Sequence, residues 1–130
     1  MGRLKPPRKL QVVPDAMTAI AYLEGRQPYS NIQDHPLPSL IFIDIKMPGM
    51  NGLEFLAWLR SQPMLKRIPA VILTSSREML DIELAYDLGA SAYFVKPNSF
   101  AEFSALLEQV LNFWSNAQIP SMKTSALPIG

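Results

Sequence analysis

The feature that most restricts the fold is a continuous apolar run that ends in one carboxylate, Leu40-Ile-Phe-Ile-Asp44. A run with no polar residue on either face is typical of a parallel strand that is buried on both sides. The segment Ile45-Lys-Met-Pro-Gly-Met-Asn-Gly52 follows at once and contains the proline and glycine residues of a turn. Open α/β sheets bind ligands at the carboxyl edge of their strands, so Asp44 is predicted to lie where chemistry takes place.

Three other short apolar runs alternate with helical patterns along the chain. They are Leu10–Val13, Ala70–Thr74 and Ala92–Val95, and apolar residues at helical spacing follow each run. Strands and helices that alternate at this spacing indicate βαβ units with parallel strands and right-handed crossovers. The sequence therefore predicts an α/β protein whose parallel sheet has four strands, joined and followed by four helices.

Capping residues predict where these helices begin and end. Asp15 is placed to cap the first helix, and Gly25 to close it. The second helix is predicted from about Leu53 to Ser61. Capping boxes are predicted for the other two, from Ser75 with Glu78 and from Ser99 with Glu102.

Four polar residues lie at or just beyond the ends of the four predicted strands, and parallel strands end at the same edge of a sheet. These residues are Asp15, Asp44, Thr74 and Lys96. Asp44 alone could equally cap the next helix, but Thr74 and Lys96 favour a chemical role. A carboxylate that becomes phosphorylated needs a cation near the phosphoryl oxygens and a hydroxyl to hold the product.

Composition excludes several classes of function. The net charge of +1 and the scattered basic residues argue against nucleic-acid and membrane partners. The chain has no cysteine, which excludes disulfides and thiolate catalysis, and it has no signal-peptide pattern, so we expect a cytoplasmic protein. No glycine-rich nucleotide-binding motif follows any predicted strand. We expect a tail over residues 1–9, one domain over 10–114 and a flexible tail over 115–130.

Four motifs, in this order, resemble those of the receiver domains of bacterial two-component response regulators. They are Ile41-Phe-Ile-Asp44, Met47-Pro-Gly-Met-Asn-Gly52, Pro69-Ala-Val-Ile-Leu-Thr74 and Leu88-Gly-Ala-Ser-Ala-Tyr-Phe-Val-Lys-Pro97. The likeness is strongest to the small stand-alone receivers that serve phytochrome-type kinases. It implies a flavodoxin-like, doubly wound fold and a function in a phosphorelay. The implied partner is a sensor histidine kinase or a phosphotransfer protein, and a homodimer is compatible with the family.

The resemblance also implies roles for single residues. Asp44 corresponds to the phosphoacceptor, which forms an aspartyl phosphate, and Lys96 to the cation that pairs with the phosphoryl oxygens. Thr74 corresponds to the switch hydroxyl and Tyr93 to the aromatic switch. Lys46 lies where the family uses a backbone carbonyl as a ligand of Mg²⁺. Such a protein signals by binding and is not an enzyme beyond slow loss of its own phosphoryl group.

The chain departs from the family at its start, because complete receivers begin with a strand that ends in two acids and holds Mg²⁺ with the phosphoacceptor. Here the segment from Leu10 to Asp15 matches the second strand, so the first strand and helix are missing and Mg²⁺ should bind weakly. The gap could be closed by the Leu10 strand, by another chain, or not at all. If it closes, Asp15 could join Asp44 at the metal, although helix capping explains Asp15 equally well. The alternative function is a degenerate receiver that takes no phosphate and serves as a docking or dimerisation module.

Overall fold

The computed structural model describes residues 12–31, 33–34 and 36–117, which form three strands and four helices. Helices and strands alternate after the first helix, as the sequence predicts. In chain order the elements are α1 (Ala16–Leu23), β1 (Ile41–Ile43), α2 (Gly52–Ser61), β2 (Ala70–Thr74), α3 (Met79–Asp87), β3 (Ala92–Val95) and α4 (Phe100–Asn116). No helix among these residues is long and apolar enough to cross a bilayer.

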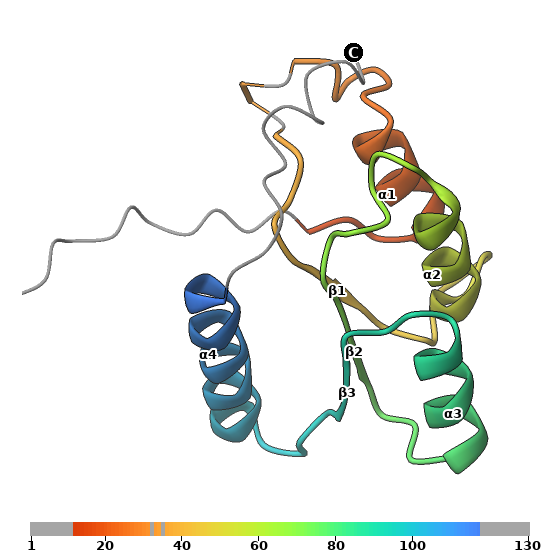
Figure 1. Ribbon diagram of the computed structural model, residues 1–130. Helices are drawn as coiled ribbons and strands as arrows, with labels where there is room; N and C mark the ends of the chain where they lie inside the picture. The colour runs from red at the N-terminus through yellow and green to blue at the C-terminus, as the bar shows by residue number, and fades with distance from the viewer. Residues whose placement is uncertain (1–11, 32, 35, 118–130) are drawn as a thin grey trace, which may run out of the picture.

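The strands form one parallel sheet in the order β1-β2-β3. Helices α1, α2 and α3 cover one face of the sheet, and α4 covers the other by itself (Figure 1). In the register, Phe42 lies opposite Val71, and Ile72 lies opposite Tyr93. Helices on both faces of a parallel sheet confirm the predicted flavodoxin-like, doubly wound class.

The predicted strand Leu10–Val13 does not form over the part of it that the structure describes. Leu10 and Gln11 lie outside the described residues, and Val12 and Val13 are irregular, with Val12 76% exposed. Within the described residues β1 pairs with β2 alone, so the described sheet has three strands where the sequence predicted four.

The core lies mainly between the sheet and helices α1 and α2. All five residues of β2 are buried, which agrees with the apolar run Ala70–Leu73 that precedes Thr74. The largest fully buried apolar side chains come from β1, α2, the following loop and β2: Ile43, Leu56, Leu59, Ile68, Val71 and Ile72. This packing fixes the central strand and therefore the positions of the residues that follow each strand.

The helix ends agree with the prediction in part. Asp15 caps α1 by accepting a hydrogen bond from the Thr18 amide at 2.8 Å, and Ser99 caps α4. The capping box of Ser75 with Glu78 was wrong, because α3 begins at Met79 without a side-chain cap. Helix α4 runs through Asn116, two residues into the predicted C-terminal tail.

One side chain that the sequence pattern did not single out links α2 to the loops that precede β2 and β3. Arg60, near the end of α2, donates to the carbonyls of Gly89, Lys66 and Ile68 at 2.9, 3.0 and 2.8 Å. These carbonyls belong to the loops that lead into β2 and β3. Partial burial lowers the pKa of Arg60 from its ordinary value.

Candidate functional site

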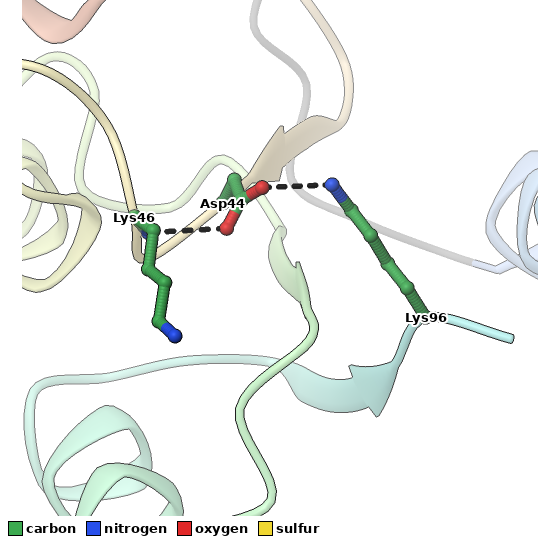
Figure 2. A network of polar contacts seen from close by, with 3 residues as sticks. All are labelled: Asp44, Lys46 and Lys96. Carbon is green, nitrogen blue, oxygen red and sulfur yellow. Dashed lines mark hydrogen bonds and ion pairs between the residues drawn. The ribbon is translucent and has the colours of Figure 1, made fainter. Parts of the chain in front are cut away.

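The carboxyl ends of the three strands bring Asp44, Thr74 and Lys96 to one edge of the sheet. The Lys96 ammonium pairs with Asp44 Oδ2 at 2.7 Å, and the two residues are 52 apart in the chain. The other oxygen, Oδ1, accepts a hydrogen bond from the Lys46 amide at 3.1 Å. Figure 2 shows both contacts, and it shows the Lys46 side chain extending away from the carboxylate. Each carboxylate oxygen thus has one positively polarised partner.

Local backbone packing holds these groups in place. The Lys96 amide donates to the Thr74 carbonyl at 2.8 Å, which continues the pairing of β2 with β3 by one residue. The loop after Asp44 closes when the Gly52 amide donates to the Ile45 carbonyl at 2.9 Å. A Cβ at Gly52 would lie 2.2 Å from the Asp44 carbonyl oxygen, so only glycine allows this approach.

Thr74 is completely buried at the end of β2, where the sequence predicted a hydroxyl. Its Oγ1 has no hydrogen-bond partner among the described residues. Burying a hydroxyl without a partner costs free energy, so a buried hydroxyl normally has one. Thr74 therefore has unused hydrogen-bonding capacity beside Asp44.

The surroundings of Asp44 set its charge. Partial burial raises the pKa of Asp44, but the hydrogen bonds from Lys96 and from the Lys46 amide, the nearby Thr74 hydroxyl and the charge of Lys96 together lower it further than burial raises it. The net pKa of Asp44 is lower than the ordinary value. Since the Asp44 and Lys96 side chains are 33% and 38% exposed, solvent screens this pair, and Asp44 is an ionised carboxylate at neutral pH.

Tyr93 lies on β3 and connects to the loop after Thr74. Its hydroxyl donates to the Ser76 carbonyl at 3.0 Å. The Ser76 hydroxyl donates to Asp81 Oδ2 at 2.6 Å, which joins the same loop to α3. The sequence analysis identified Tyr93 but not Ser76. The only sequence signal for Ser76 is that it is a small polar residue two positions after Thr74.

The described residues do not form a carboxylate cluster that fits Mg²⁺. No group of three or more histidine, cysteine or acidic residues lies close enough among them to hold a metal ion. Asp15, predicted as an additional ligand, uses Oδ1 to cap α1, and this hydrogen bond lowers its pKa. Asp44 is the acid at this edge, and both its oxygens already have partners. Mg²⁺ is usually anchored by one or two carboxylates and keeps several waters.

Comparisons with known proteins agree on one family. Residues 10–108 match the family model described as response regulator receiver domain. Response regulator Rcp1 of Synechocystis sp. is 32% identical over 106 residues, which are 82% of this chain and 70% of Rcp1. The crystal structure of the phosphorylated cyanobacterial phytochrome response regulator RcpA has a TM-score of 0.78 and 36% identity, over 84% of this chain and 76% of that one.

A third comparison bears on the metal. The Mn²⁺-bound form of response regulator Rcp1 is 30% identical, with a TM-score of 0.77, over 87% of this chain and 80% of that one. That relative therefore binds a divalent cation. Likeness to the phytochrome response regulators Rcp1 and RcpA agrees with the resemblance that the sequence motifs indicated.

Proposed function

Because this chain belongs to the response regulator receiver family, we propose that it accepts a phosphoryl group on Asp44 and signals by binding other proteins. The phosphoryl donor is a histidine of a sensor kinase or of a phosphotransfer protein. The observation that carries the proposal is the 2.7 Å pair of Lys96 with Asp44 at the edge where Thr74 is buried. A nucleophile, a cation and a hydroxyl thus come from the ends of three different strands.

The transfer uses groups that are already in place. A carboxylate oxygen of Asp44 attacks the phosphorus atom, the bond from phosphorus to the donor histidine nitrogen breaks, and that nitrogen keeps the electron pair. The low pKa of Asp44 keeps the nucleophile ionised. The Lys96 ammonium, now 2.7 Å from Oδ2, then pairs with a phosphoryl oxygen.

The aspartyl phosphate formed on Asp44 would give the buried Thr74 hydroxyl a hydrogen-bond partner. A phosphoryl oxygen on Asp44 would accept a hydrogen bond from Thr74, whose Oγ1 otherwise lacks a partner among the described residues. Movement of Thr74 would pull the loop that contains Ser76, and this loop is joined to Tyr93 and to α3. We propose that Thr74 and Tyr93 carry the signal from the phosphorylated edge to the surface of α3.

We further propose that this chain binds Mg²⁺ more weakly than Rcp1 does, since Asp44 is the carboxylate available at the edge. Lys46 remains the predicted source of a backbone carbonyl ligand. A Mg²⁺ titration of the full chain beside Rcp1, followed by tryptophan fluorescence, tests this. Half-saturation at the same concentration in both proteins would contradict weak binding.

The test of the main proposal is phosphorylation by acetyl phosphate in excess Mg²⁺, read by intact mass and peptide mapping. We expect one phosphoryl group on Asp44, none in Asp44→Asn, and a rate lower by about 10²-fold in Lys96→Met. Lys66→Met removes an exposed lysine outside the site and is the matched control. A chain that gains no mass where RcpA does would overturn the proposal in favour of the degenerate docking module, which the comparisons do not support.

A further inference from the structure

A short segment, residues 75–78, joins β2 to α3 and follows Thr74 directly. Ser76 in this segment is buried, with 7% of its surface accessible, whereas the other three residues of the segment are exposed. A buried polar side chain normally has hydrogen-bond partners, and these partners fix its position. Ser76 is therefore the point at which this otherwise exposed segment is held.

Ser76 has partners on both of the elements beside it. Its hydroxyl donates to Asp81 Oδ2 on α3 at 2.6 Å, and its carbonyl accepts from the Tyr93 hydroxyl on β3 at 3.0 Å. The Ser76 hydroxyl also accepts from the Glu78 amide at 3.3 Å. One residue thus connects the segment after Thr74 to α3 and to β3.

The contact with Asp81 also holds the start of α3. The N-cap residue Glu78 makes no side-chain hydrogen bond to the helix, and Asp81 is the acid of the first turn. Helix N-termini leave backbone amides without intrahelical partners, and a capping side chain commonly fixes the path of the chain there. In α3 the link from Asp81 back to Ser76 takes this role. The segment after Thr74 and the first turn of α3 therefore form one unit.

This unit restrains Thr74 from one side, and β3 restrains it from the other. The Lys96 amide donates to the Thr74 carbonyl at 2.8 Å, and Ser76 follows two positions after Thr74. Threonine is β-branched, so the direction of its hydroxyl depends closely on its backbone. Thr74 Oγ1 is buried without a hydrogen-bond partner among the described residues, and an unrestrained backbone would relieve this cost by turning the hydroxyl toward a partner. The two restraints hold an unpaired hydroxyl beside Asp44.

We propose that the hydrogen bond between Ser76 and Asp81 positions the Thr74 hydroxyl for the phosphoryl group on Asp44. Ser76 and Asp81 are then positioning residues, since neither is a hydrogen-bond partner of Asp44. The inference rests on the proposed function and deepens it, because it names the residues that control the hydroxyl of that site. Coupling of this kind is reciprocal, so a phosphoryl group that binds Thr74 also stabilises the first turn of α3.

The first measurement is the rate of phosphorylation by acetyl phosphate in excess Mg²⁺, read by intact mass. Asp81→Ala should lower this rate by about fivefold, because Ser76 loses its acceptor and Thr74 is no longer held. Asp81→Asn should keep the wild-type rate, since its amide oxygen still accepts from the Ser76 hydroxyl. Glu83→Ala removes a carboxylate from an exposed position of the same helix and is the matched control. An Asp81→Asn rate as low as that of Asp81→Ala would overturn the role of the hydrogen bond.

A double-mutant cycle with Thr74→Val separates positioning of the hydroxyl from general support of the fold. Thr74→Val removes the hydroxyl and should itself slow phosphorylation. Adding Asp81→Ala should then slow it no further, because the hydroxyl that Asp81 positions is absent. If Asp81→Ala lowers the rate by the same factor in both backgrounds, Asp81 acts independently of Thr74 and the inference is wrong.

A second readout needs no phosphoryl group. The methyl NMR signal of Thr74 in the unphosphorylated chain should shift in Asp81→Ala and in Ser76→Ala, and should stay in place in Asp81→Asn and in Glu83→Ala. A wild-type chain that gains no mass would refute the proposed function alone, and shifted Thr74 signals would still support the positioning. A Thr74 signal that stays in place in Asp81→Ala and Ser76→Ala would overturn the positioning, whatever the result of phosphorylation.

Discussion

Replacing Gly52 by alanine should disrupt the loop that presents Asp44. Gly52 is the first residue of α2, and a Cβ there would lie 2.2 Å from the Asp44 carbonyl oxygen and 2.8 Å from Ile43 Cγ2. Cβ atoms essentially never lie under 3.0 Å from such an atom, so the carbonyl must retreat by about 0.8 Å. Because Asp44 follows β1 directly, this displacement also moves its carboxylate.

The expected change in the free energy of unfolding of Gly52→Ala is the balance of two unfavourable effects and one favourable effect. Overpacking against fixed backbone costs about 1–3 kcal/mol, and losing the hydrogen bond from the Gly52 amide to Ile45 costs about 1 kcal/mol more. Alanine restricts the unfolded chain, which returns about 0.4–1 kcal/mol. The net loss in the free energy of unfolding should be about 1–3.6 kcal/mol. Gly49→Ala is the control, since its Cβ would meet nothing within 4 Å and only its positive φ of 73° opposes the change, at a net cost of about 1 kcal/mol.

Urea unfolding of the three proteins, followed by tryptophan fluorescence and circular dichroism, measures these differences. Gly52→Ala should also slow phosphorylation of Asp44 by acetyl phosphate more than Gly49→Ala does. The close-approach argument is refuted if Gly52→Ala stays within about 0.5 kcal/mol of the wild type, which is the range of neutral surface changes. It is refuted equally if Gly49→Ala proves the more destabilising of the two.

Three other outcomes can be checked by the same methods. Arg60→Met should lower the free energy of unfolding by about 3 kcal/mol, because three carbonyls lose a charged donor; a loss under about 1 kcal/mol would contradict this. Asn51→Ala removes the cap of α2 and should cost about 1 kcal/mol, whereas Glu54→Gln, whose amide oxygen can still accept from the Asn51 amide, should be nearly silent. The stability that the wild type gains over Asp44→Asn should be present above about pH 4 and vanish as pH falls through the lowered folded pKa of Asp44; a pH-independent difference would contradict the lowered value.

The buried strands were predictable because their signal is local. The limits of Ala70–Thr74 and Ala92–Val95 are those that the apolar runs predicted. At Val12 and Val13, the described part of the predicted strand Leu10–Val13, no strand forms, because the structure of a weak apolar run depends on its tertiary surroundings more than on its own residues. The start of α3 failed because Ser76, rather than Ser75, accepts from the Glu78 amide.

The candidate site was predictable where it depends on topology alone. Parallel strands place Asp44, Thr74 and Lys96 at one edge whatever their loops do, and the pair of Lys96 with Asp44 agrees with this placement. The contact of the Lys46 amide with Asp44, and the link from Tyr93 to Ser76, depend on the path of the loops. Asp15 is not among the observed contacts of Asp44, because its carboxylate accepts a hydrogen bond from the Thr18 amide at the N-terminus of α1.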